Sequence, residues 1–221
     1  MEELAIDFAD ALKSIDADKR SHKQFAPGVG PYGEADAVRA ALSKLRIAKA
    51  LPLNKCFKST PTVQYSQWFM RRIWITYLPT DPKPVVYADA AIKRLPDLLI
   101  PGQWAVEYKI VRPFGNNGQP AEHWSENILH PYVGNTSSLG DCLRLLSSGL
   151  TERKAVIIFG YEHTPPKVSL DAAITGFELL AKEVVGLRLS DRAEQLRNGL
   201  IHEVHQQLRV FAYEVLGTQD N

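Results

Sequence analysis

The chain has 221 residues, of which 45% are hydrophobic and 23% are charged. This is the composition of an ordinary globular domain, and it excludes collagen-like, coiled-coil and fully disordered chains. No apolar run approaches the roughly 20 residues needed to cross a bilayer, and the acidic N-terminal segment lacks the basic-then-apolar order of a signal peptide. Cys56 and Cys142 form neither a disulfide framework nor a zinc-binding spacing. We therefore expect a cytoplasmic protein.

The net charge of +1 hides an uneven distribution of charge along the chain. Residues 1–18 hold one basic and six acidic residues, residues 19–96 hold fourteen basic and four acidic ones, and residues 97–221 hold eleven basic and fifteen acidic ones. A basic stretch of this kind is the usual footprint of a polyanionic partner. A solvated surface with scattered lysines gives the same count, so both interpretations stay open.

The first third of the chain has two helical patterns. Apolar spacing predicts a helix over residues 2–16, and a loop rich in glycine and proline follows up to residue 32. A second helix begins after Gly33, and Pro52 stops it. The aromatic and β-branched segment 62–78 fits a strand and a helix equally. We divide the chain into an N-terminal helix and loop, residues 1–32, and an α/β domain, residues 33–221, within one compact unit.

The remainder of the chain alternates strand and helix patterns. Two apolar runs, 95–101 and 104–111, are joined by Gly102 and Gln103 and predict a β-hairpin. Short helices are expected over 121–130 and 138–149, the latter starting at Ser137 or Ser138. A buried strand follows over 154–162, then a helix over 169–185, which Ser169 begins. The tail, 196–216, reads as two strands with a tight connection near Gln206 and Gln207, or as a helix.

Three charged residues interrupt the apolar runs of the hairpin. Asp97 lies in LPDLLI, and Glu107 and Lys109 lie in WAVEYKIV. Charges are costly to bury unless they are paired or bind a metal. Because side chains alternate along a strand, Glu107 and Lys109 share one face, and the hairpin brings Asp97 close to them. A surface strand with a Glu–Lys pair and an Asp capping a turn is the alternative.

Two carboxylates and an ammonium at one point meet the needs of phosphodiester hydrolysis, which requires a divalent cation and an activated water. Asp97 and Glu107 offer the oxygen ligands that Mg²⁺ prefers, with Mn²⁺ as a second choice, and the Tyr108 carbonyl adds a third. Lys109 can hold or deprotonate the water, or stabilise developing negative charge.

The sequence Pro96-Asp97 followed by Glu107-Tyr108-Lys109 resembles the motif of the PD-(D/E)xK nuclease superfamily. The resemblance covers residues 33 to 161. It implies a restriction-endonuclease-like core, an α/β fold with a mixed β-sheet flanked by helices. It also implies an acidic residue on the preceding helix that completes the metal site, for which Glu34 is the candidate and Asp36 the weaker one.

The resemblance implies a metal-dependent endonuclease of restriction, anti-phage defence or repair, acting on DNA, with RNA left open, as a homodimer. The alternatives are a nuclease-like subunit that binds DNA without cutting it, and a small α/β protein with no nucleic-acid role.

Other residues have weaker claims to a function. Arg112 follows the catalytic strand and can contact a phosphate, and Asn116 or Asn117 can read a base edge, although a plain connecting loop fits equally. Arg71 and Arg72 lie among aromatic residues, which are more often core than nucleic-acid platform.

Four histidines and Cys142 are expected to have no catalytic or metal-binding role. His202 and His205 do not form the HExxH zinc pattern, so we expect ordinary strand or surface histidines. His123 and His130 are expected to face solvent, and Cys142 the core.

Overall fold

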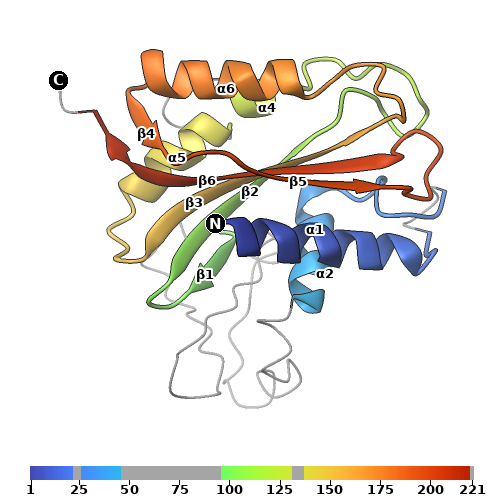
Figure 1. Cartoon of the computed structure of the whole chain (residues 1–221), viewed down its shortest axis with the longest axis horizontal. Coiled ribbons are helices and arrows are strands. Elements are labelled where there is room, and N and C mark those ends of the chain that lie inside the picture. Colours follow the sequence, from blue (N-terminus) through green and yellow to red (C-terminus); the bar gives the residue numbers. More distant parts are fainter. Residues whose placement is uncertain (22–25, 46–95, 131–136, 220–221) are drawn as a thin grey trace, which may run out of the picture.

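A six-stranded mixed sheet lies between two layers of helices in the computed structural model of the chain, which describes residues 1–21, 26–45, 96–130 and 137–219 (Figure 1). The helices are α1 (Glu2–Ala17), α2 (Glu34–Lys44), α4 (Glu126–Leu129), α5 (Ser138–Leu146) and α6 (Asp171–Glu183). The strands are β1 (Leu98–Ile100), β2 (Trp104–Val111), β3 (Arg153–Glu162), β4 (Leu187–Leu189), β5 (Ala193–Asn198) and β6 (Gln207–Thr218). None of the helices in these ranges is both long and apolar enough to cross a membrane.

The sheet has the order β1-β2-β3-β6-β4, and β5 also pairs with β6. Strands β2 and β3 are parallel, and every other pair is antiparallel. Strands β4 and β5 lie one after the other along the same edge of β6, because β4 pairs with its C-terminal end and β5 with its N-terminal half. The predicted α/β class with a mixed sheet flanked by helices is confirmed.

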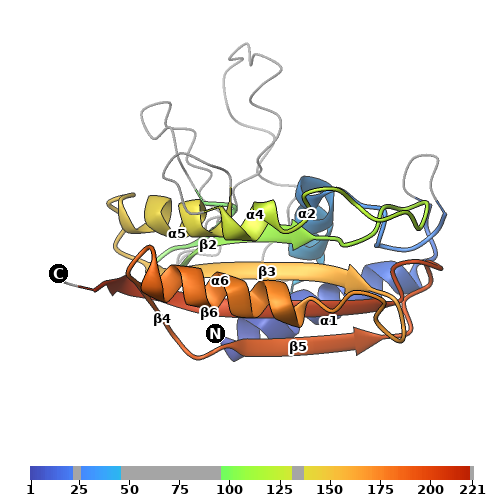
Figure 2. The same cartoon turned by 90° about the horizontal axis from the view of Figure 1, so that it is seen from above.

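Both faces of the sheet are buried, which explains the continuous apolar run of β3. One face packs against α1 and α2, where the Phe8 ring lies 4.6 Å from the Tyr108 ring and 5.2 Å from the Phe159 ring. The other face packs against α4, α5 and α6 through Val156, Ile158 and their neighbours. Figure 2 shows α6 and α1 on opposite sides of the sheet. Since residues of β2 alternate between these faces, Tyr108 points toward α1, and Glu107 and Lys109 point toward α5.

The predicted hairpin, the buried strand and the start of α5 agree with the structure. β1 and β2 are joined by a turn of three residues, 101–103, one more than predicted, and the Ser137 side chain caps α5 by accepting a hydrogen bond from the Gly140 N–H. Ser169 is not the N-cap of α6 as predicted: the residue preceding that helix is Leu170, and the Ser169 hydroxyl accepts a hydrogen bond from the Asp171 N–H.

Three predicted elements need correction, and one strand was missed. The second helix, expected to run from Gly33 to Pro52, ends at Lys44, where Leu45 turns to an extended conformation. The helix expected over 121–130 is a single turn, 126–129. The tail consists of strands, as preferred, but the connection is not tight: eight residues, 199–206, join β5 to β6. The short strand β4 was missed, because three residues after a helix carry too little pattern to predict a strand. The segment 62–78 lies outside the described residues.

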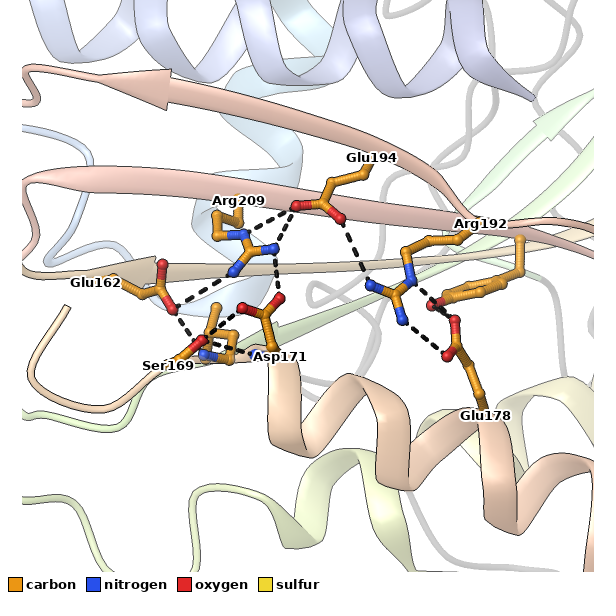
Figure 3. Close-up of polar contacts among 9 residues, drawn as sticks. Glu162, Ser169, Asp171, Glu178, Arg192, Glu194 and Arg209 are labelled. Atoms are coloured by element: carbon orange, nitrogen blue, oxygen red, sulfur yellow. Dashed lines mark hydrogen bonds and ion pairs between the residues drawn. The ribbon is translucent and has the colours of Figure 1, made fainter.

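A network of charges joins α6 to the strands beside it (Figure 3). The Arg209 guanidinium contacts Asp171 at 2.6 Å, Glu194, and the buried Glu162 at 3.9 Å. Arg192 binds both oxygens of Glu178 at 2.8 Å. These ion pairs fix the N-terminus of α6 against β3, β5 and β6, so the network has a structural role.

Candidate active site at the free edge of β2

Among the described residues, the edge of β2 that faces β1 is paired with a strand only over Trp104 to Val106, since β1 has three residues. Beyond that point, two carboxylates accept its backbone N–H groups. Asp97 Oδ2 accepts a hydrogen bond from the Tyr108 N–H at 3.0 Å, and Glu34 Oε2 accepts one from the Ile110 N–H at 3.0 Å. The hairpin and α2 therefore place two acids side by side along one strand edge.

Asp97 and Glu107 are neighbours because of the hairpin register. Leu98 pairs with Val106, so the register continued by one residue sets Asp97 opposite Glu107. The N–H and the C=O of an extended residue project toward the same edge. The Tyr108 carbonyl therefore projects toward the edge where its N–H meets Asp97.

Glu107 and Lys109 are buried, at 5% and 8% exposure, so the alternative of a solvated surface strand is wrong. Burial, with the Glu107 charge adding to it, raises the pKa of the Cys142 thiol to about 12. Glu107 lies on the same face of β2 as Lys109, which contacts Asp141 of α5, so the Glu107 carboxylate is on the α5 side of β2. Cys142 itself is fully buried in the core, as predicted.

The Lys109 ammonium lies between two carboxylates from different elements. Its Nζ is 3.6 Å from Glu34 Oε1 and 3.3 Å from Asp141 Oδ2. Glu34 is the residue of α2 that reaches the strand, whereas Asp36 pairs with Arg39 one turn further along the helix at 3.1 Å. Glu34, the preferred candidate from the sequence, is thus brought together with Lys109.

The sequence analysis missed Asp141 and its partner Arg144, whose guanidinium contacts the other carboxylate oxygen of Asp141. The sequence does contain a signal that marks Asp141. Ser138, Asp141, Cys142 and Leu145 follow the i, i+3, i+4, i+7 spacing of a core-facing helical stripe, so an acid stands where an apolar residue is expected. The Asp141 side chain is 2% exposed.

The donor chemistry at this edge fits a hard divalent cation. Asp97, Glu107 and the Tyr108 carbonyl are oxygen donors, the type that Mg²⁺ takes. Within the described ranges, no three acidic, histidine or cysteine side chains form a group that could hold a metal ion. Both oxygens of Glu34 have partners, one in the Ile110 N–H and one in Lys109. The residues that would hold an ion here are Asp97, Glu107 and the Tyr108 carbonyl, completed by water.

The loop after β2 is anchored by its polar side chains. The Arg112 guanidinium is half-buried and donates to the Gly30 carbonyl at 3.1 Å, and burial lowers the pKa of Arg112 while the nearby Tyr161 and Glu34 raise it. Asn116 Oδ1 lies 3.0 Å from His205 Nε2, and Asn117 Oδ1 accepts from the Gln119 N–H at 3.1 Å. Of these residues, Arg112 is the one whose charge interacts with a residue of the candidate site, Glu34.

His202 and His205 are not the strand or surface residues that were predicted. Both are buried in the loop between β5 and β6, at 3% and 1% exposure, with their rings stacked 4.8 Å apart. Gly30 faces the His205 ring so closely that a Cβ there would lie 2.5 Å from the His205 Cβ. Burial lowers the pKa of His205 to about 3. Two further histidines were predicted to face solvent: His123 is exposed as predicted, and His130 is half-buried.

Most of the basic segment 19–96, including Arg71 and Arg72, lies outside the described residues, so its placement relative to β2 stays a prediction. Comparison of the chain with protein-family models, with curated proteins and with solved structures gives no match.

Proposed function

We propose that this chain is a metal-dependent nuclease that hydrolyses phosphodiester bonds in DNA, with a restriction-endonuclease-like core. The observation that carries the proposal is that Asp97 and Glu34 accept hydrogen bonds from the Tyr108 and Ile110 N–H groups of one strand, and that Glu34 also contacts Lys109. The hairpin register sets Glu107 opposite Asp97. The burial of Glu107 and Lys109 supports the proposal, because two charged side chains buried in a strand cost free energy that an ordinary surface hairpin avoids.

In this proposal Asp97, Glu107 and the Tyr108 carbonyl hold Mg²⁺, or Mn²⁺ in its place. The cation supplies positive charge against the phosphate and activates water. Lys109 directs its ammonium toward the same place, where it orients the attacking water and stabilises negative charge that develops on the phosphate. Glu34 fixes that ammonium and the strand edge together.

Substrate binding is assigned to positive charge around the site. Arg112 follows β2 directly and contacts a phosphate, Asn116 and Asn117 lie on the same loop, and the basic segment with Arg71 and Arg72 holds more of the backbone. Phosphate contacts of this kind give binding that weakens with salt. Since a duplex has two strands and the chain has one candidate site, we propose a homodimer. Light scattering that finds a monomer with and without DNA contradicts this last point.

The experiment is incubation of the purified chain with supercoiled plasmid, linear duplex, single-stranded DNA and RNA, each with Mg²⁺ or with EDTA. Cleavage of a DNA substrate that requires the metal supports the proposal, and cleavage of RNA alone changes the substrate class. Salt-sensitive DNA binding without cleavage of any substrate favours a second function, a non-catalytic DNA-binding subunit. The engagement of both Glu34 oxygens in the protein speaks for this second candidate. Absence of binding and cleavage contradicts both.

A further inference from the structure

Asp141 is a buried acid that faces the candidate site from α5. Its side chain is 2% exposed, and its Oδ2 has no hydrogen-bond partner among the described residues. The cation that this oxygen faces is Lys109 Nζ, at 3.3 Å. A buried carboxylate is retained only where cations compensate for its loss of water, so the pairing with Lys109 is a specific feature of this fold.

Arg144 prepares Asp141 for this contact. It lies three residues along the same helix and contacts the other oxygen, Oδ1, and residues at this spacing are neighbours on a helix surface. The carboxylate is therefore oriented before it meets the strand, and Oδ2 is left to face Lys109.

Two carboxylates thus hold the Lys109 ammonium from different directions. Glu34 reaches it from the edge of the sheet, where it also accepts the Ile110 N–H, and Asp141 reaches it from the helix over the sheet face. A free lysine side chain samples many rotamers. Contacts on two sides remove that freedom before any substrate arrives.

We infer that Asp141 is a positioning residue for the proposed nuclease reaction: it acts through Lys109, whose ammonium it fixes beside Asp97 and Glu107. This role rests on the proposed function. A reacting group misplaced by about 1 Å can lose roughly 10²-fold in rate, so the geometry of the Asp141–Lys109 pair sets the turnover number and leaves substrate affinity alone.

The test combines Asp141→Asn, Lys109→Ala and the double variant in single-turnover cleavage, with Asp10→Asn as a control, because Asp10 is also ion-paired but lies on α1 against Arg197 of β5. We expect Asp141→Asn to lower kcat by about 10- to 100-fold with KM for DNA unchanged, and to cause no further loss when Lys109 is already alanine. An equal loss in the Lys109→Ala background overturns the inference, because Asp141 then acts independently of Lys109.

A second variant and a second readout keep the inference testable if Asp141→Asn folds poorly or the parent chain cuts nothing. Asp141→Glu keeps the buried charge and displaces it by one methylene, so it should fold and show a smaller fall in kcat. In protein labelled at the lysine ε-carbon, with the Lys109 signal assigned by Lys109→Arg, either Asp141 variant should shift that signal more than any other lysine's. An unshifted Lys109 signal contradicts the positioning role, whereas absence of cleavage by the parent contradicts the proposed function alone.

Discussion

The Tyr108 N–H donates a hydrogen bond to Asp97 Oδ2 at 3.0 Å, so the residue that precedes β1 is fastened to the strand that follows it. The three-residue β1 begins at Leu98, and the Asp97 side chain before it accepts the next N–H group along the edge of β2. Because the next donor on that edge, the Ile110 N–H, goes to Glu34, the acids substitute for a missing neighbouring strand. On the same edge, the Tyr108 carbonyl projects beside Asp97.

The metal assignment predicts which carboxylates matter for ion binding. Mn²⁺, followed by electron paramagnetic resonance as a stand-in for Mg²⁺, should bind at least about tenfold more weakly to Asp97→Asn and Glu107→Gln. Glu34→Gln should bind it nearly as well as the parent, since its oxygens serve Lys109 and the Ile110 N–H. Asp36→Asn, on the same helix, is the matched control. A loss in Glu34→Gln as large as that in Asp97→Asn would make Glu34 a ligand.

The buried histidines predict loss of stability at mildly acidic pH. The pKa of His205 falls from 6.5 to about 3 on folding because burial disfavours the charged ring. The unfolded chain therefore binds a proton at this histidine more readily than the folded chain does. The resulting loss in the free energy of unfolding is absent above pH 6.5 and grows by about 1.4 kcal/mol per pH unit as the pH falls toward 3. His202 and His163 shift in the same direction.

Urea unfolding of the parent and of His205→Gln at several pH values between 7 and 5 measures this effect. Glutamine can keep a hydrogen bond to Asn116 and cannot titrate, so the pH slope should fall by about 1.4 kcal/mol per unit. His123→Gln, whose side chain is 73% exposed, should leave the slope unchanged. An unaltered slope in His205→Gln would assign the acid sensitivity to other groups.

The charge network around Arg209 predicts a stability effect away from the candidate site. Arg209→Met should lower the free energy of unfolding by about 2 kcal/mol, discounted because Asp171 and Glu194 are partly exposed. The Arg209 hydrogen bond holds the pKa of Asp171 below its ordinary value of 3.8. The stabilisation is therefore present above that value and is lost as the pH falls, so parent and variant should converge in acid.

Chemical denaturation at neutral and acidic pH tests this, with Arg188→Met as the control because Arg188 is exposed on β4. Equal losses in the two variants would mean that the network contributes nothing beyond a surface arginine.

Much of the fold was predictable because its signals are local. The hairpin follows from Gly102 and Gln103 between apolar runs, and β3 from an unbroken apolar stretch. The pairing of Glu34 with β2 is a contact across 76 residues, and it came from a resemblance to a family, since no local pattern predicts it.

The remainder depends on tertiary packing. His205 is buried by the approach of Gly30 and Asn116, and His202 by the approach of Gly28, all of which lie far away in the sequence. Asp141 is an intermediate case. Its place on the apolar stripe of α5 was visible in the helical spacing, but only the fold shows that the cation opposite it is Lys109.

The most direct test of the central claim is Mg²⁺-dependent cleavage of DNA by the parent chain and by Asp97→Asn, Glu107→Gln and Lys109→Ala, with Asp36→Asn as the control on α2. We expect cleavage by the parent and the control, stopped by EDTA, and a loss of at least about 10²-fold in each of the other three. Cleavage by Asp97→Asn and Lys109→Ala at the parent's rate would contradict it, because the free edge of β2 would then not be where the reaction takes place.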